Sequence, residues 1–429
     1  MPQAPTLPSP GDLHDDQIVA LLRTGAHSAL LSAYFGDVAY RELAQLAKIA
    51  ATRHNPRGKV VFVLPGIMGS RLGSLSKQSS SLLWLHPVAI AQGGLSQLAL
   101  PGSKSLRALG VMLPGYLKMR LCLEIAGFRP VFHPFDWRAD LETLARGLLR
   151  SIEKSGARTV SIVAHSMGGL VARIALAQDR DKRIRKLVQL GAPNEGSFAP
   201  VQALRAAYPT VRKIASLDLR NTAEELARTV FLTLPGLYQM LPSQLSADEP
   251  NLFDARQWPD DGLAPDPKML ARAYKVRSRM PAADGRCAVI VGANQDTVTS
   301  VTVGDGGFEY TIRREGDGTV PLSRALWKGA DTWFADENHG ALTNNNDVLA
   351  AVASILKDAP VARLPTARPA AVTSVVRKVT DRELRAAAIH KVQWDSLSLD
   401  SRRRILDPVL TPEFIAAAVV AAPGALGIG

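Results

Sequence analysis

Two hydrophobic patterns alternate along the first half of the chain. Short continuous apolar runs, such as "KVVFVL" at 59–64 and "TVSIVA" at 159–164, are typical of strands buried on both faces of a sheet. Between such runs lie segments in which apolar residues recur every three or four positions, most clearly over 140–154. Further strand-like runs lie at 128–137 and 184–193. Strands that alternate with helices predict a parallel sheet covered by helices on both faces.

The same patterns divide the chain into four parts. Residues 1–57 are expected to form a helical N-terminal extension that is Pro-rich at its start. The α/β domain would span 58–357, and repeated prolines mark a linker over 358–375. The remaining residues, 376–429, would form a small helical segment.

Within the α/β domain, the alternation stops after Pro193. Residues 195–283 are rich in Leu, Pro and Ala and have helical spacing, which predicts an inserted helical lid or cap. The elements expected after it are a strand at 287–294, a hairpin at 297–314, a strand at 331–335 and a closing helix at 346–357.

The composition is that of a folded protein with a sizeable core, since 46% of the 429 residues are hydrophobic. Basic residues outnumber acidic ones by 51 to 39, a net charge of +12. Because these charges are scattered, we interpret them as a solvated surface, with an anionic membrane surface as the alternative partner. The aromatic residues do not alternate with basic ones, which argues against a nucleic-acid partner.

Signals for cofactors, metals and targeting are missing from the sequence. Two cysteines, Cys122 and Cys287, make neither a disulfide framework nor a zinc cluster. We expect no cofactor and no metal, because no nucleotide, redox or zinc motif occurs. The start of the chain does not resemble a signal peptide, and the longest apolar run, 414–429, is shorter than a membrane span. We therefore expect a cytoplasmic protein, or one held peripherally at a membrane.

A polar segment, "AHSMGG" at 164–169, stands between a predicted strand and a predicted helix. It is close to the G-x-S-x-G turn that presents a nucleophilic serine, with Ala164 in place of the first glycine. Such a turn would lift the Ser166 hydroxyl above the carboxyl edge of the sheet. In the alternative interpretation Ser166 only caps the helix. The presence of partner residues must decide between them.

A nucleophilic serine needs an imidazole as its base. Among the eight histidines only His339 and His390 follow Ser166 in the chain. His339 lies in a polar loop directly after a predicted strand, where a base belongs, whereas His390 lies in a basic, helical stretch beyond the linker. We favour His339.

The carboxylate that orients this base is expected between the strand at 287–294 and His339. Asp317 lies in "EGDGTVP", where flanking glycines let the backbone bend around a carboxylate. We favour it over Asp296, at a strand end, and over Asp305, a natural hairpin-turn residue. The backbone N–H groups of Ile67, after "VLPG", and Met167 are the expected oxyanion donors.

With these residues assigned, the chain resembles the lecithin–cholesterol acyltransferase-like family of α/β-hydrolases over about residues 58–357. The motifs that carry the resemblance are "VLPGIMGSRL", "LWLHP", "FDWR", "AHSMGG", "LPGLYQMLPS", "GDGTVP" and "ENHGAL". The resemblance implies an α/β-hydrolase fold, with Ser166 as nucleophile, Asp317 as acid, His339 as base, and Ile67 and Met167 as oxyanion donors. It also implies an acyl-ester substrate, often a phospholipid, approached through a lid.

Large apolar residues in these motifs are candidate substrate or lid contacts. They are Trp84, Trp137, Phe231, Leu237, Tyr238 and Met240. The competing interpretation is structural: the segment around 231–241 packs as an extra core layer, and "FDWR" holds a buried ion pair and an aromatic plug.

The function predicted from the sequence is a serine acyl hydrolase that cleaves carboxylic esters, especially of lipids. One alternative is an O-acyltransferase that uses the same three residues with an alcohol acceptor. A second is a non-catalytic module that binds a lipid or a protein.

Overall fold

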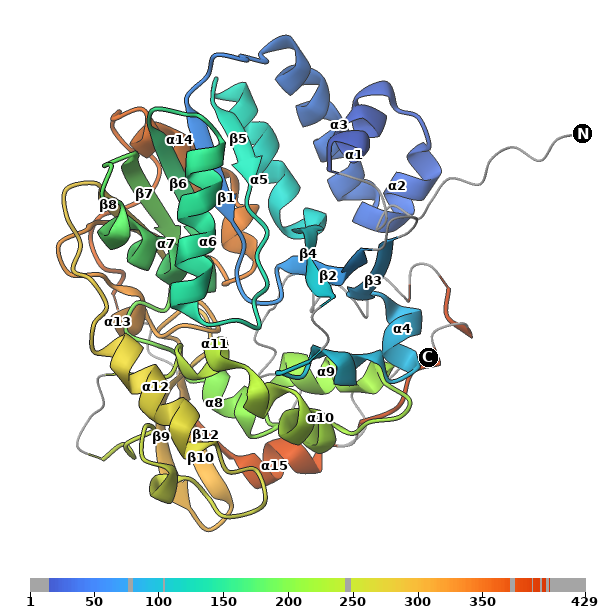
Figure 1. Cartoon of the computed structure of the whole chain (residues 1–429), viewed down its shortest axis with the longest axis vertical. Coiled ribbons are helices and arrows are strands. Elements are labelled where there is room, and N and C mark those ends of the chain that lie inside the picture. Colours follow the sequence, from blue (N-terminus) through green and yellow to red (C-terminus); the bar gives the residue numbers. More distant parts are fainter. Residues whose placement is uncertain are drawn as a thin grey trace, which may run out of the picture.

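A six-stranded parallel sheet forms the centre of the molecule (Figure 1). The computed structural model describes residues 15–75, 80–102, 105–243, 248–370, 375–387, 389–393, 396–398 and 401. The strands, in their order across the sheet, are β11 (Asp331–Ala335), β8 (Cys287–Gly292), β7 (Ile184–Leu190), β6 (Val160–His165), β1 (Val60–Leu64) and β5 (Arg129–Phe132). The predicted α/β-hydrolase class, with a mostly parallel sheet, is confirmed.

Alternate residues of each strand face opposite layers of helices. Phe62 belongs to the core on the side of α6 (Leu141–Lys154) and α7 (Met167–Gln178). Its neighbour Val63 belongs to the opposite core, with α5 (Leu113–Ile125) and α14 (Asn346–Leu356). Because both faces are covered, the strands read as continuous apolar runs, as the sequence indicated.

The N-terminal residues form three helices, α1 (Asp15–Thr24), α2 (Ser28–Phe35) and α3 (Asp37–Thr52), which pack on α5. A second, antiparallel sheet is formed by the segment that follows β1 in the chain and has the order β3-β2-β4. Its strands are β2 (Ser70–Leu75), β3 (Ser80–Trp84) and β4 (Leu106–Val111). The short helices α4 (Pro87–Ala91) and η2 (Gly94–Leu98) lie between β3 and β4 in the chain. The sequence pattern did not predict this sheet, because "SRLGSL" has neither a continuous apolar run nor a strict alternation.

The insertion after β7 is helical in the residues that the structure describes, as predicted. Its elements are α8 (Ala199–Leu204), α9 (Pro209–Leu217), α10 (Ala223–Thr229), η3 (Phe231–Thr233), α11 (Pro235–Tyr238), η4 (Ala255–Gln257) and α12 (Pro267–Arg277). We call residues 195–283 the cap. A capping box starts α10: the Thr222 side chain accepts from the Glu225 N–H, and the Glu225 carboxylate accepts from the Thr222 N–H.

A third sheet corrects the prediction for the C-terminal part. The predicted hairpin forms from β9 (Thr297–Gly304) and β10 (Gly307–Arg313), and β12 (Arg377–Thr380) pairs antiparallel with β10. Residues 377–380, expected to be helical, are therefore a strand, because β10 offers them an open edge to pair with. Only α15 (Asp381–Ala386) is helical directly after it. The short helices α13 (Leu322–Ala325) and η5 (Ala341–Thr343) complete the described elements.

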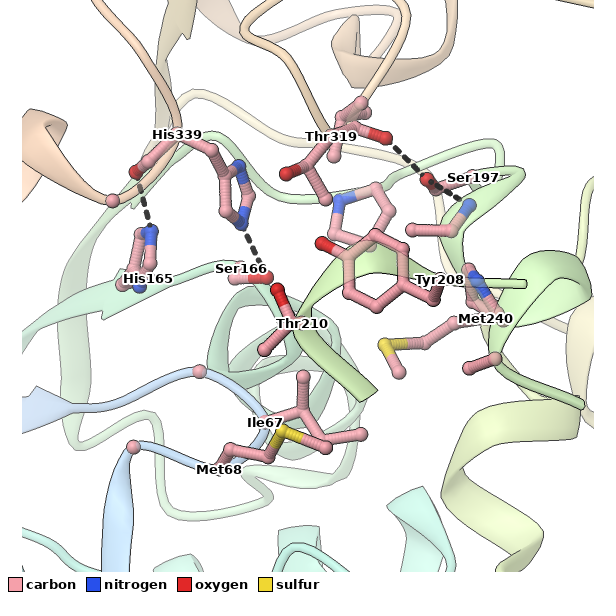
Figure 2. Close-up of a pocket in the computed structure, with 18 of the residues that line it drawn as sticks. Ile67, Met68, His165, Ser166, Ser197, Tyr208, Thr210, Met240, Thr319 and His339 are labelled. Atoms are coloured by element: carbon pink, nitrogen blue, oxygen red, sulfur yellow. Dashed lines mark hydrogen bonds between the residues drawn. The ribbon is translucent and has the colours of Figure 1, made fainter. Parts of the chain in front are cut away.

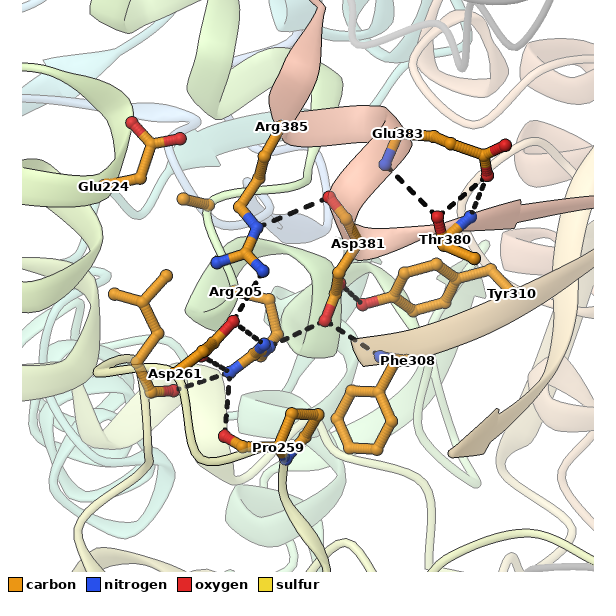
Figure 3. Close-up of polar contacts among 12 residues, drawn as sticks. Arg205, Glu224, Pro259, Asp261, Phe308, Tyr310, Thr380, Asp381, Glu383 and Arg385 are labelled. Atoms are coloured by element: carbon orange, nitrogen blue, oxygen red, sulfur yellow. Dashed lines mark hydrogen bonds and ion pairs between the residues drawn. The ribbon is translucent and has the colours of Figure 1, made fainter. Parts of the chain in front are cut away.

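A buried ion-pair network fastens the C-terminal segment to the cap (Figure 3). The guanidinium of Arg205, which follows α8, donates from Nε to Asp381 at 2.8 Å and from Nη2 to Asp261 at 2.6 Å. Asp381 also accepts from the Tyr310 hydroxyl at 2.7 Å. Both Arg205 and Asp381 are fully buried. The cap, β10 and the C-terminal segment, which are far apart in the sequence, therefore meet in one polar network.

Part of the predicted linker, 358–375, packs against the α/β domain. Leu364 is buried, and the Pro365 carbonyl accepts a backbone hydrogen bond from Phe334 in β11. The Pro-rich start, the basic run at 402–404 and the apolar run at 414–429 lie outside the described residues. Within the described residues, no helix is both long enough and apolar enough to cross a membrane.

Candidate active site

Ser166 stands at the sharp turn between β6 and α7. Its backbone has φ 53° and ψ −125°, a strained conformation for a residue with a side chain. The side chain makes no capping hydrogen bond to the helix that begins at Met167. The simple N-cap interpretation is therefore wrong, and the turn presents the hydroxyl to other groups.

The loop after β1 passes directly against this turn, and two glycines permit the approach. A Cβ on Gly168 would lie 2.4 Å from the carbonyl oxygen of Pro65, and a Cβ on Gly66 would lie 2.9 Å from the Cβ of Ser166. Gly69 closes the loop as a tight turn by donating its N–H to the Gly66 carbonyl at 3.1 Å. Ile67 lies within that turn and lines the same pocket as Ser166.

His339 and Asp317 meet Ser166 in one hydrogen-bonded line. The Nε2 atom of His339 lies 2.9 Å from the Ser166 hydroxyl, and its Nδ1 lies 2.7 Å from a carboxylate oxygen of Asp317. The other carboxylate oxygen accepts from the N–H groups of Thr319 and Val320, which fixes the carboxylate plane. All three residues of the line are buried; Ser166 and His339 follow β6 and β11 of the parallel sheet, and Asp317 follows the hairpin strand β10.

The alternatives weighed for the base and the acid lie elsewhere. Asp296 forms an ion pair with Arg377, and Asp305 is exposed in the hairpin turn. His390 is exposed in the segment after α15. The structure thus brings together the three residues that the sequence favoured.

A second hydrogen-bonded line, which the sequence did not reveal, runs behind the first. The Gly66 N–H donates to the Tyr116 hydroxyl at 2.9 Å, and that hydroxyl lies 2.9 Å from Nδ1 of His165. Nε2 of His165 lies 3.0 Å from the backbone carbonyl of His339. Burial lowers the pKa of His165 to about 3. A neutral ring with its proton on Nε2 satisfies both contacts.

A pocket of about 90 Å³ opens onto Ser166 and His339 under the cap (Figure 2). Its apolar wall comes from the loop after β1, from the residue before α5 and from the cap, and includes Ile67, Met68, Met112, Val211, Leu237 and Met240. Hydroxyl side chains also line it, among them those of Tyr208, Thr210 and Thr319. Leu237 and Met240 were predicted to contact substrate, and both lie on this wall.

Four other predicted contacts do not line the pocket. Trp84 and Trp137 are buried behind the loop after β1, where their rings meet edge to face 5.3 Å apart. Their indole N–H groups donate to backbone carbonyls of Met68 and Ser70. These tryptophans stabilise the loop. Arg138 forms an ion pair with Asp136 next to Trp137 in the chain, which agrees with the interpretation that "FDWR" holds an ion pair and an aromatic plug.

Phe231 and Tyr238 are likewise packed in the interior of the cap. The Tyr238 hydroxyl donates to the Leu232 carbonyl at 2.9 Å and is not directed at Ser166. Both residues were assigned to the substrate because they are large and apolar, and that property does not separate a core position from a pocket position.

Comparisons with known proteins agree with this architecture. Residues 131–300 match the family described as "alpha/beta hydrolase fold". A chain in the crystal structure of the Tle4–Tli4 complex superposes with a TM-score of 0.51 over 70% of this chain and 98% of its own, at 14% identity. The chain has the α/β-hydrolase fold.

Two further solved structures match over comparable lengths with lower TM-scores. The mature Bacillus licheniformis lipase BlEst2 is 13% identical, with a TM-score of 0.34 over 68% of this chain and 89% of its own. Carboxylesterase CesB from Bacillus subtilis is 11% identical, with a TM-score of 0.35 over 72% and 87%. A search of curated proteins found no match. At these identities the likeness concerns the fold alone.

In the α/β-hydrolase fold, ligands meet the sheet at the carboxyl ends of its strands, which is where the pocket lies. The order of the hydrogen-bonded residues along this chain, Ser166, Asp317 and then His339, is the order usual for serine enzymes with this fold. Among the described residues, no group of three His, Cys, Asp or Glu side chains is arranged to bind a metal ion.

Proposed function

We propose that the protein is a serine hydrolase that cleaves carboxylic esters through an acyl-enzyme on Ser166. The observation that carries this proposal is the continuous line from the Ser166 hydroxyl through His339 to Asp317, with contacts of 2.9 and 2.7 Å. A serine that only supported the fold would not need a strained backbone and a buried imidazole partner that a carboxylate orients. The same line argues against a module that only binds lipid or protein.

The residues divide the chemistry as follows. His339 Nε2 takes the proton from Ser166 while the serine oxygen attacks the ester carbonyl carbon. The developing oxyanion would be stabilised by the N–H groups of Ile67 and Met167, the latter at the N-terminus of α7. His339 then gives its proton to the leaving alcohol, and an acyl group remains on Ser166. Water, activated by the same imidazole, releases the acid.

Asp317 acts on the imidazole and does not touch the ester. Its contact with Nδ1 leaves Nε2 of His339 free to accept the serine proton, and its negative charge stabilises the imidazolium that forms. The N–H groups of Thr319 and Val320 keep the carboxylate in place through this cycle.

The transfer of the acyl group to an alcohol would use the same intermediate. Ser166 and His339 are only 6% and 4% exposed under the cap, which limits the access of water to the acyl-enzyme. Analysis of products with and without an added acceptor alcohol separates the two reactions: a new ester in the first case indicates transfer, and free acid in both cases indicates hydrolysis.

A fluorophosphonate probe tests the proposal, because it reacts with an activated serine. We expect the wild-type protein to be labelled and Ser166→Ala to be neither labelled nor active on p-nitrophenyl esters. Ser161→Ala, on the same strand but away from the pocket, is the matched control and should be labelled like the wild type. Equal labelling of the Ser166→Ala protein would overturn the assignment.

A further inference from the structure

The wall of the pocket is uncharged in the part of the chain that the structure describes. No Lys, Arg, Asp or Glu side chain lines it, and its ionisable groups are two histidines and two tyrosines. Burial raises the pKa values of Tyr116 and Tyr208, so both stay neutral. This is a local property, since the chain carries 51 basic and 39 acidic residues.

One part of this neutral wall carries hydroxyl groups. Tyr208 and Thr210 stand at the start of α9, and Thr319 stands two residues after Asp317 in the chain. The Thr210 and Thr319 hydroxyls face the Tyr208 hydroxyl, and Figure 2 shows all three side chains directed into the pocket. The Thr319 Oγ1 atom is buried and has no well-aligned hydrogen-bond partner among the described residues.

A hydroxyl cluster in which the Thr319 Oγ1 atom is buried without a well-aligned partner is suited to a polar, uncharged ligand group. Leaving such a group unpaired in a closed site is unfavourable, so a ligand hydroxyl that pairs with it gains binding energy. A phosphate or ammonium group would instead lose its hydration without meeting an opposite charge. The remaining wall, with Ile67, Leu237 and Met240, is suited to an acyl chain.

We propose that the substrate is an ester of an uncharged, hydroxyl-bearing alcohol, of the monoacylglycerol type, and that Tyr208, Thr210 and Thr319 bind a free hydroxyl of that alcohol. This inference rests on the proposed ester hydrolysis at Ser166. It differs from the phospholipid class that the family resemblance implies, because a charged head group has no partner in the pocket.

Three substrates with the same octanoyl chain test the substrate class: the monoacylglycerol, the methyl ester and the lysophosphatidylglycerol. We expect kcat/KM to fall in that order, with about a tenfold step for the missing hydroxyl. Equal or faster cleavage of the lysophospholipid would overturn the inference, as would a protein that reacts with fluorophosphonate but cleaves none of the three. A protein that neither reacts with the probe nor cleaves any ester refutes the proposed hydrolysis itself.

Variants of the hydroxyl cluster test which residues act. Thr210→Val and Thr319→Val should each reduce the preference for the monoacylglycerol over the methyl ester by about tenfold, mainly through KM. Thr210→Ser keeps the hydroxyl and should restore the preference. Met240→Leu, on the apolar wall, is the control and should change both esters by the same factor. A folded Thr→Val variant with the wild-type preference would exclude its hydroxyl from alcohol binding.

Discussion

The ring of His165 contacts the backbone carbonyl of His339 at 3.0 Å, so the residue before the nucleophile holds the loop that carries the base. On its other side His165 contacts Tyr116, which in turn accepts from the Gly66 N–H. The loop after β1 and the loop after β11 are therefore joined by side chains behind Ser166. Neither Tyr116 nor His165 is needed to move a proton in the proposed reaction, so their role is to position groups that are.

The first prediction tests whether this line positions the reacting groups. Tyr116→Phe removes the contact to Gly66 and His165, and should lower kcat about tenfold with little change in KM, because it misplaces groups that act in the transition state. Tyr274→Phe, on the exposed surface of α12, should retain wild-type kinetics. Steady-state kinetics on a p-nitrophenyl ester provide the measurement.

Two substitutions of His165 test its contact to Tyr116 and its contact to the His339 carbonyl separately. Gln keeps an N–H that can reach the carbonyl of His339, whereas Asn keeps an acceptor for Tyr116 and loses that reach. If the base loop is what must be held, His165→Gln should retain more kcat than His165→Asn. The reverse order would show that the contact to Tyr116 matters more.

The second prediction concerns the acid. Asp317→Asn keeps the shape of the side chain but removes the charge that supports the imidazolium, and should lower kcat on the order of 10⁴-fold. Asp305→Asn, in the exposed hairpin turn, should leave the rate unchanged. Thermal unfolding of both variants checks that the fold is intact. A small effect at Asp317 together with a large one at Asp305 would mean that the acid is wrongly assigned.

The third prediction concerns the pH dependence of stability. Burial lowers the pKa of His133 to about 4, whereas an unfolded histidine titrates near 6.5. Between these values the unfolded chain binds a proton that the native chain does not, so the free energy of unfolding falls as the pH is lowered. The contribution is complete above pH 6.5 and is lost towards pH 4, at up to about 1.4 kcal/mol per pH unit.

His133→Asn should therefore flatten the dependence of unfolding free energy on pH between 6.5 and 4, by up to about 1.4 kcal/mol per unit. Above pH 7 the curves of the variant and the wild type should run parallel, because neither state then takes up this proton. Urea unfolding at a series of pH values measures both regions. Parallel curves over the whole range would show that His133 is protonated alike in both states.

The sequence predicted Ser166 and His339 because each of them follows a strand of the parallel sheet with a strong hydrophobic pattern, β6 or β11. Ser166 and Asp317 lie in glycine-containing turns, and His339 was one of two histidines in the right part of the chain. The parallel topology then brings the ends of β6 and β11 to one edge of the sheet, whereas Asp317 follows the hairpin strand β10 and reaches the same edge through its bridge to Gln295, after β8. Local pattern and long-range geometry agree here, which is why a prediction from sequence was possible.

Other features depend on contacts that leave no local pattern. Tyr116 lies inside α5, and only the packing of that helix brings its hydroxyl to His165. The strand at 377–380 forms because β10 has an edge to pair with. Trp84 and Trp137 have the same apolar character as pocket residues, and only the fold shows that they support the neighbouring loop from behind.

The fourth prediction tests the network that fastens the C-terminal segment. Asp381→Asn removes the charge that meets Arg205 at 2.8 Å, and leaves a buried guanidinium partly unpaired. We expect a loss of about 3–5 kcal/mol in unfolding free energy, measured with urea. Asp358→Asn breaks the exposed pair with Lys186 and should lose less than about 1 kcal/mol. Equal losses would mean that burial of the Asp381 pair adds nothing.

The last prediction concerns the cap as an acyl-binding wall. Leu237, in α11, is 4% exposed and lines the pocket together with Met240. A buried CH₂ group gains about 0.8 kcal/mol, so a long acyl chain depends on this wall and an acetyl group does not. Leu237→Asp should therefore lower kcat/KM for long-chain p-nitrophenyl esters far more than for p-nitrophenyl acetate.

Because an aspartate at Leu237 can also unfold the cap, Leu237→Ala is measured beside it and should show the same selectivity with a smaller loss. Phe231→Leu is the matched control, since Phe231 is buried in the cap but does not line the pocket. It should lower stability while changing the two esters equally. If the Leu237 variants also lost both activities equally, α11 would support only the fold, and the apolar wall would have to be assigned to the loop around Ile67 and Met68.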